Sequence, residues 1–177
     1  LALKRKDNQK AYILDMHTGE LSTECLCHDA QINDLVFSMD DQRIASGDLN
    51  GCIKVWDALT LECVTTINTD NYVFALCFSA DGKRLYSGGF SGEIKVWDAR
   101  NGVLLKTLMS STGDVRKLAI SADGTKLISG NTFVGQIWDT KTGKCMITLF
   151  HEICSGKALI SADGSYAAVT RSRVFSE

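Results

Sequence analysis

The heptapeptide Gly-Cys-Ile-Lys-Val-Trp-Asp, at residues 51–57, returns almost unchanged as Gly-Glu-Ile-Lys-Val-Trp-Asp at residues 92–98. A shorter copy, Gly-Gln-Ile-Trp-Asp, ends at Asp139. The tryptophans of these copies follow one another at intervals of 41 residues. A fixed period of roughly 40–45 residues with a Trp-Asp pair in each unit is typical of stacked four-stranded sheets. The sequence therefore predicts an all-β chain built from repeats.

On these motifs the chain resembles the WD-repeat family of β-propellers over essentially its whole length. The resemblance implies one WD-repeat propeller segment at residues 1–177, with three complete four-stranded blades and a partial blade at each end. The expected complete repeats are residues 28–68, 69–110 and 111–150, and the expected partial blades are residues 1–27 and 151–177. The outer strand of the first partial blade is predicted at residues 20–26.

Partial blades would leave unpaired strand edges, which folded proteins avoid by closing or covering them. Three arrangements remain open, and the first is favoured: the segment belongs to a longer propeller, two copies close one ring together, or the two partial blades of one copy pair. The expected partners therefore include the remainder of a larger propeller, or a second copy of the chain.

Composition narrows the function classes. With 45% hydrophobic residues and a net charge of −2, the chain of 177 residues is expected to be folded and to lack a broad basic surface for nucleic acid. No apolar run approaches the roughly 18 residues that cross a bilayer, so we expect no membrane partner. The first residues, which include Lys4, Arg5 and Lys6, do not resemble a signal peptide. The expected location is the cytoplasm or nucleus.

The seven cysteines are interpreted as ordinary packing residues rather than as a metal or disulfide framework. Cys63 and Cys145 fall in a repeat position that is apolar in the other copies, and Cys77 falls just before an inner-strand aromatic residue. Cys25, Cys27 and His28 are the one cluster that resembles metal ligands, but the second pair of a zinc finger is missing. We expect no metal and no cofactor.

In the WD-repeat family, a buried polar network joins the strand Trp of each blade to a Ser or Thr, a His and an Asp. The first complete repeat has His28, Ser46 and Trp56, with Asn50 where the acid is expected. The later repeats have Ser or Thr at the His position, so the resemblance implies that no network is complete. The residues with this structural role are His28, Ser46, Asn50, Trp56, Ser87, Trp97, Ser129 and Trp138.

A catalytic set is not predicted. The chain has only three histidines, and His28 and His151 occupy the structural position at the start of a blade, while His17 falls in a turn. No nucleophile elbow, phosphate loop or dinucleotide motif occurs. An enzyme is the third-ranked hypothesis, without positive support.

One short motif is more specific. Trp97-Asp98-Ala99-Arg100 matches the W-D-x-R box of WD-repeat substrate receptors of cullin-based ubiquitin ligases, in which the arginine contacts the adaptor. The other Trp-Asp copies lack this arginine, and the upstream acidic position of the box is Ser91 here. The leading hypothesis is thus a non-catalytic scaffold that binds proteins or peptides, and the alternative is a ligase substrate receptor that uses Arg100.

Partner binding is predicted on the rim formed by the blade-start loops and the turns between second and third strands. Tyr72 and Phe90 belong to one blade and are expected to lie side by side as an exposed hot spot, because rigid aromatic residues dominate many interfaces. The alternative left open is that Phe90 folds inward and Tyr72 only begins the inner strand. Further residues expected at this rim are Asp70, Asp114, Gln31 and Leu49.

The open edges generate a first prediction. The 177-residue segment on its own should self-associate or be poorly soluble, because unpaired strands and the apolar flank of a terminal blade would be exposed. Light scattering after gel filtration would give its molar mass. A sharply melting monomer whose ends do not pair would contradict this expectation.

Overall fold

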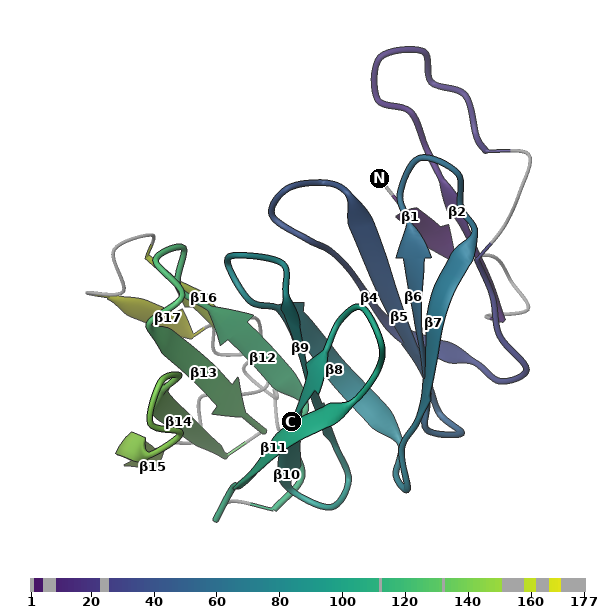
Figure 1. Cartoon of the computed structure of the whole chain (residues 1–177). Helices are drawn as coiled ribbons and strands as arrows, with labels where there is room; N and C mark the ends of the chain where they lie inside the picture. The colour runs from purple at the N-terminus through teal and green to yellow at the C-terminus, as the bar shows by residue number, and fades with distance from the viewer. Residues whose placement is uncertain are drawn as a thin grey trace, which may run out of the picture.

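The computed structural model describes residues 2–4, 9–22, 26–111, 113–131, 133–150, 158–161 and 166–169. This part of the chain forms five antiparallel sheets arranged one after another along the sequence (Figure 1). Within the described residues, no helix is long and apolar enough to cross a lipid bilayer.

Three of the sheets are complete four-stranded blades, as predicted. Each is a meander in which consecutive strands pair, so that the first strand lies at one edge and the fourth at the other. The first blade contains β4 (Ile32–Phe37), β5 (Arg43–Asp48), β6 (Cys52–Asp57) and β7 (Cys63–Asn68). The second contains β8 (Val73–Phe78), β9 (Arg84–Gly89), β10 (Glu93–Asp98) and β11 (Leu104–Met109). The third contains β12 (Lys117–Ile120), β13 (Lys126–Gly130), β14 (Val134–Asp139) and β15 (Cys145–Phe150).

Smaller sheets flank these blades. The N-terminal sheet contains β1 (Ala2–Lys4), β2 (Lys10–Ile13) and β3 (Leu26–Cys27), and the C-terminal sheet contains β16 (Ala158–Ile160) and β17 (Ala167–Val169). Of the outer strand expected at residues 20–26, the described residues show β3 and an isolated bridge between Leu14 and Leu21.

The hairpin that opens the repeated heptapeptide needs a glycine. Gly51 has a φ of 85°, and an added Cβ would lie 2.7 Å from the carbonyl oxygens of Thr69 and Asn71. Gly92 takes the same place one repeat later, with a φ of 78°. Only glycine adopts this conformation without strain. The glycine of the motif is therefore explained by backbone geometry and close packing together.

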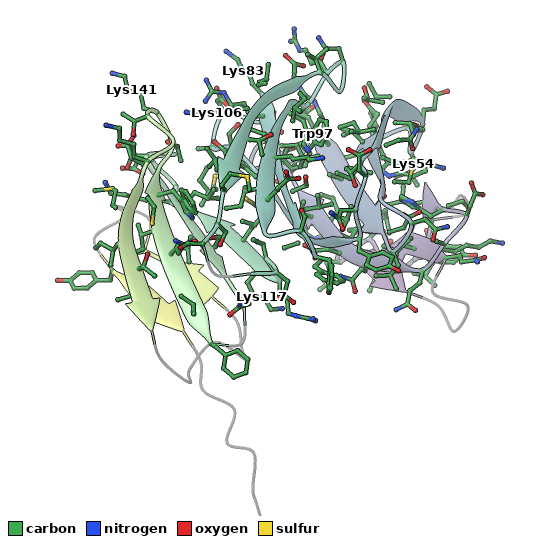
Figure 2. All side chains as sticks on the ribbon, turned by 90° about the horizontal axis from the view of Figure 1, so that it is seen from below. Lys54, Lys83, Trp97, Lys106, Lys117 and Lys141 are labelled. Atoms are coloured by element: carbon green, nitrogen blue, oxygen red, sulfur yellow. The ribbon has the colours of Figure 1, made fainter. Side chains whose placement is uncertain are left out.

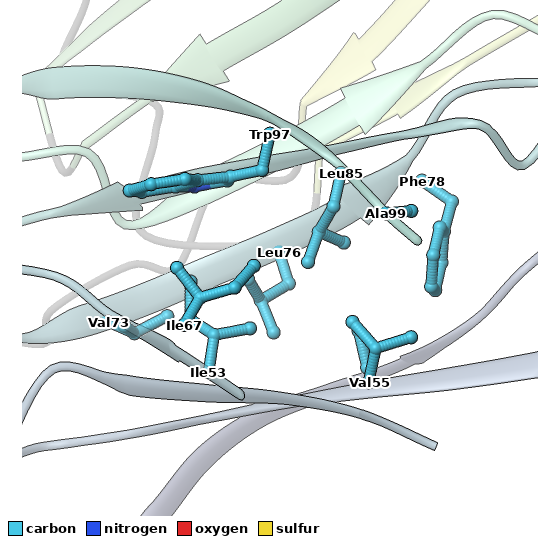
Figure 3. Close-up of a cluster of buried hydrophobic side chains, with 10 residues drawn as sticks. Ile53, Val55, Ile67, Val73, Leu76, Phe78, Leu85, Trp97 and Ala99 are labelled. Carbon is cyan, nitrogen blue, oxygen red and sulfur yellow. The ribbon is translucent and has the colours of Figure 1, made fainter. Parts of the chain in front are cut away.

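The hydrophobic core lies between successive blades rather than inside one blade. Trp97 and Leu85 of the second blade pack against Ile53, Val55 and Ile67 of the first (Figure 3). An equivalent cluster joins the third blade to the second, and another joins the first blade to the N-terminal sheet. Each blade thus buries its apolar face against its neighbour, as expected of a stacked repeat.

Two of the cysteine expectations are wrong. Cys77 is buried in the second blade as expected, and burial raises the pKa of its thiol. Cys63 and Cys145, however, are exposed, because they lie at the start of outer strands that have no neighbour on their free edge. Cys27 is disulfide-bonded, which the sequence analysis does not anticipate.

A second prediction tests the inter-blade core. Replacing the fully buried Leu85 by Ala should lower the free energy of unfolding by about 2–5 kcal/mol, because it leaves a cavity between two blades. Leu59→Ala is the matched control, since this leucine is 92% exposed. Denaturant unfolding followed by tryptophan fluorescence would measure both. Equal stability of the two variants would mean that the blades do not pack as described.

Candidate functional site: the polar network and the aromatic rim

A tryptophan-to-serine hydrogen bond recurs in each complete blade. The indole Nε1 donates to a serine Oγ of the neighbouring second strand at 2.8 Å in every case, in the pairs Trp56–Ser46, Trp97–Ser87 and Trp138–Ser129. Both partners are buried. The third pair is separated by nine residues instead of ten, because β13 is one residue shorter than β5 and β9.

In the first blade this bond extends into a four-residue network. The Ser46 hydroxyl lies 2.6 Å from Nε2 of His28, and Nδ1 of His28 lies 3.0 Å from Oδ2 of Asp48. An ionised carboxylate only accepts, so Nδ1 carries the proton and Nε2 accepts from Ser46. Oδ1 of Asp48 accepts the backbone N–H groups of Asn50 and Cys52 at 2.9 and 2.8 Å. Every polar group of the network is therefore satisfied.

The expectation that no network is complete, with Asn50 in the place of the acid, is wrong. Asp48 is the acid, and the Asn50 side chain is exposed in the turn. Ser46 and Asp48 lie two residues apart on β5 and therefore face the same side of the sheet. Strand alternation from Ser46 predicts the acid at residue 48 rather than at residue 50.

The second blade lacks both the histidine and the acid. Thr69 stands at the histidine position and donates to the carbonyl oxygen of Asn71 at 2.6 Å. Gly89 takes the place of Asp48, and a side chain there would collide with the carbonyl oxygen of Tyr72. A cavity of about 20 Å³ beside Thr69 and Gly89 is large enough for one water molecule.

The third blade also has a different residue at this place. Asn131 accepts the backbone N–H groups of Phe133 and Val134 at 2.8 and 3.0 Å, as Asp48 does with its own turn. Among the described residues of the second and third blades there is no His–Asp pair. The complete four-residue network is thus confined to the first blade within the part of the chain that is described.

His28, Asp48 and Cys52 bring ligand-type atoms within 4.8 Å of one another. Both ring nitrogens of His28 already have hydrogen-bond partners, as do both carboxylate oxygens of Asp48. Burial raises the pKa of the Cys52 thiol, which keeps it protonated. The Cys25-Cys27-His28 cluster offers no free thiolate at Cys27, because that residue is disulfide-bonded. The chemistry of this site is that of a structural hydrogen-bond network.

On the rim, Tyr72 and Phe90 are both exposed, by 52% and 63%. Val73 pairs with Gly89 across β8 and β9, so the two aromatic residues flank adjacent ends of neighbouring strands. Phe90 therefore does not fold inward. The Tyr72 ring packs at 6.2 Å from the ring of Phe74, a residue that the sequence analysis did not select. We call Tyr72, Phe74 and Phe90 the aromatic rim.

The acidic residues beside the aromatic rim are in ion pairs. Asp70 lies 3.4 Å from Nζ of Lys95, and Asp114 lies 2.6 Å from Nε of Arg116. The guanidinium of Arg116 also stacks over Phe74 at 4.8 Å, a favourable cation–π arrangement. The surroundings of the aromatic rim are thus mixed in charge rather than acidic, because Lys95 reaches it from β10 and Arg116 from the loop before β12.

The other selected residues lie at different places. Gln31 is exposed and Leu49 is half-buried, and the Leu49 N–H donates to the Gln31 carbonyl oxygen at 3.1 Å in the first blade. Arg100 is exposed and follows the opposite end of β10 from Phe90, so it lies on the opposite rim. Its backbone is fixed, because its N–H donates to Asp98 and its carbonyl accepts from Thr65. Adaptor binding through Arg100 stays a prediction.

Comparison with known proteins agrees with this geometry. Residues 19–57 and 61–98 match the family "WD domain, G-beta repeat". The matches show WD40 repeats at two positions of this chain, and the all-β, blade-like sheets of the described residues are consistent with a WD40 propeller segment. Domains of this class are generally non-catalytic scaffolds for protein–protein interaction.

The curated relatives include the angio-associated migratory cell protein of Homo sapiens, Pongo abelii and Canis lupus familiaris. Each is 36% identical to this chain over 62 residues. The match covers 35% of this chain and 14% of the relative, so the chain corresponds to a small part of those proteins.

A third prediction concerns the pH dependence of stability. Burial lowers the pKa of His28 from its ordinary 6.5, and Asp48 opposes this only in part. Below about pH 6.5 the unfolded chain then binds a proton that the folded chain does not, so the stability of the wild type falls as the pH decreases toward the folded-state pKa. The stability difference between wild type and His28→Gln should therefore narrow from about pH 7.5 to 5.5.

Urea unfolding at several pH values would measure this difference, with His17→Gln as a matched control for the loss of one histidine. A difference that widens on acidification would mean that the folded protein holds His28 protonated. That result would contradict the neutral ring derived above.

Proposed function

We propose that this WD-repeat segment is a non-catalytic platform that binds a partner protein or peptide at the aromatic rim. The observation that carries the proposal is the exposure of Tyr72 and Phe90 on adjacent strand ends of one blade. Buried aromatic anchors contribute a large part of the binding energy at many interfaces. A surface that already presents two such rings in the unbound protein needs little reordering to form an interface.

The backbone beneath the rim supports this role because it is held in place. Val73, next to Tyr72, is buried, and Gly89, next to Phe90, accepts the backbone N–H of Val115 from the third blade at 2.8 Å. The aromatic side chains therefore project from strand ends that are fixed by two blades. Rings mounted on a rigid scaffold lose less conformational entropy on binding than rings on a mobile loop.

The charges around the rim indicate what kind of partner would fit. Asp70 is almost fully exposed and pairs with Lys95, whereas Asp114 pairs with the arginine that stacks on Phe74. Such a mixed polar border around aromatic residues is the usual arrangement of a protein–protein interface. We therefore expect a partner segment with an apolar or aromatic anchor, and with polar residues of both signs beside it.

A fourth prediction tests this surface. Tyr72→Ala with Phe90→Ala in the complete protein should reduce partner capture strongly, because truncation of one such anchor commonly costs about 2 kcal/mol or more. The matched control is Met39→Ala with Leu59→Ala, which removes two exposed apolar side chains from the opposite rim. Affinity capture with mass spectrometry and a thermal melt would be measured for both variants.

Unchanged capture by the rim variant would refute the site. Lost capture accompanied by a large decrease in melting temperature would mean that the two residues act in packing instead. Retained stability with lost capture, and normal capture by the control, is the expected result.

A further inference from the structure

A groove of about 310 Å³ lies between the second and third blades, toward the rim opposite the aromatic rim. Tyr86, Val96 and Leu108 of the second blade form its apolar floor, and Leu105 of β11 borders it. Lys106 of β11 and Lys141 of the turn after β14 supply ammonium groups at its side. We call this feature the inter-blade groove.

Two replacements between successive repeats reduce the apolar packing at this junction, and one of the new residues, Thr140, lines the groove. At the junction of the first and second blades, Phe78 and Ala99 are buried in the cluster that contains Val55 and Ile67. One repeat later these positions hold the shorter Ile120, which is only partly buried, and the polar Thr140. The later junction therefore contains less apolar volume, and Thr140 turns its hydroxyl toward the carbonyl oxygen of Gly124 at 2.6 Å. The space that remains is bordered by the groove residues.

The groove is lined by three cations, Arg84, Lys106 and Lys141. Neither Lys106 nor Lys141 forms an ion pair with any residue that the structure describes. Lys106 donates to a neutral acceptor, the carbonyl oxygen of Thr142, at 2.6 Å. Figure 2 shows these lysines with Lys83 at one end of the molecule, whereas Lys117 lies toward the other end. Asp81 and Asp123 lie near Arg84, beside the far part of this region.

The preceding junction provides an internal comparison. Thr65 takes the place of Lys106 there, and it also bonds across the junction, from its hydroxyl to the carbonyl oxygen of Arg100 at 2.6 Å, one repeat position before the acceptor that Lys106 uses. The bond across the junction therefore needs only a neutral hydroxyl. The positive charge of Lys106 is additional to what holds the blades together, and it lies beside an apolar floor in a chain whose net charge is −2.

We propose that the inter-blade groove binds an acidic peptide segment of a partner protein, with an apolar side chain seated between carboxylates. The apolar side chain would lie on Val96 and Leu108, and the carboxylates would pair with Lys106 and Lys141. The groove volume is at the lower end of the roughly 300–1,000 Å³ that small-ligand sites occupy, so it accommodates one or two side chains rather than a folded domain. Complementary charge selects the acidic partner. This surface is separate from the aromatic rim and does not depend on it.

The test uses a phage library of random dodecapeptides selected on the complete protein. Selected peptides should be rich in Asp and Glu around a Leu, Ile or Phe. Their affinity, measured by fluorescence polarisation, should fall about tenfold or more in Lys106→Glu with Lys141→Glu, because the peptide carboxylates then meet like charges. The milder double variant Lys106→Gln with Lys141→Gln should show a smaller loss of peptide affinity. It keeps the test valid if the charge-reversal variant does not fold.

The matched control is Lys10→Glu with Lys117→Glu, which makes the same change in net charge at exposed positions outside the groove. It should retain peptide binding. The proposal would be overturned if no peptides were enriched or if the enriched peptides lacked acidic residues. It would also be overturned if acidic peptides bound the lysine charge-reversal variant and the control variant with equal affinity. Stronger binding of a twelve-nucleotide oligothymidine than of the peptides, lost in the lysine variants, would also overturn it.

Discussion

The third-strand tryptophan is the residue on which the rest of the fold depends, because it acts in two directions. Its indole N–H is fixed by a serine of its own blade, at 2.8 Å in each complete blade. Its ring faces the preceding sheet: Trp97 packs with Val55 and Ile67, and Trp138 packs with Val96 and Leu108. One side chain therefore joins hydrogen bonding within a blade to hydrophobic packing between blades. This double constraint accounts for the constant 41-residue interval between tryptophans, although much of the intervening sequence differs.

The histidine and the acid of the polar network are present or absent together, and the cost of buried polar groups explains why. A buried carboxylate such as Asp48 is costly unless it is hydrogen-bonded, and removing only its histidine would leave one oxygen unpaired. In the second blade both partners are gone, and the Tyr72 carbonyl occupies the place where a side chain on Gly89 would begin. The tryptophan-to-serine bond persists without them. The second blade therefore keeps its packing against its neighbour, and only the residues beneath its rim differ from those of the first blade.

The fold could be predicted because its determinants are local and periodic: the Trp-Asp pair recurs every 41 residues, and the turn glycine and the serine of the second strand recur at nearly the same interval. The position of Asp48 was missed because it depends on strand alternation rather than on distance from the turn. The exposure of Tyr72 and Phe90 follows from their place at strand ends, and it was predicted. Their ionic surroundings were not, since Lys95 comes to the aromatic rim from β10 and Arg116 from the loop before β12. Cys63 and Cys145 were expected to be buried because their repeat position is apolar. On an outer strand, however, a side chain at this position is exposed.

The sequence unit and the structural blade are offset by one strand. Residues 61–98, one match to the family, contain β7 of the first blade together with β8, β9 and β10 of the second. The boundary between two units therefore falls inside a sheet, in the turn between β6 and β7, where backbone hydrogen bonds join the two sides. A chain cut by a protease at Leu59 or Thr60, both exposed in this turn, would still be held together by the pairing of those strands. The repeat boundary in the sequence and the boundary between sheets therefore lie at different positions along the chain. A backbone cut at the repeat boundary does not separate neighbouring blades.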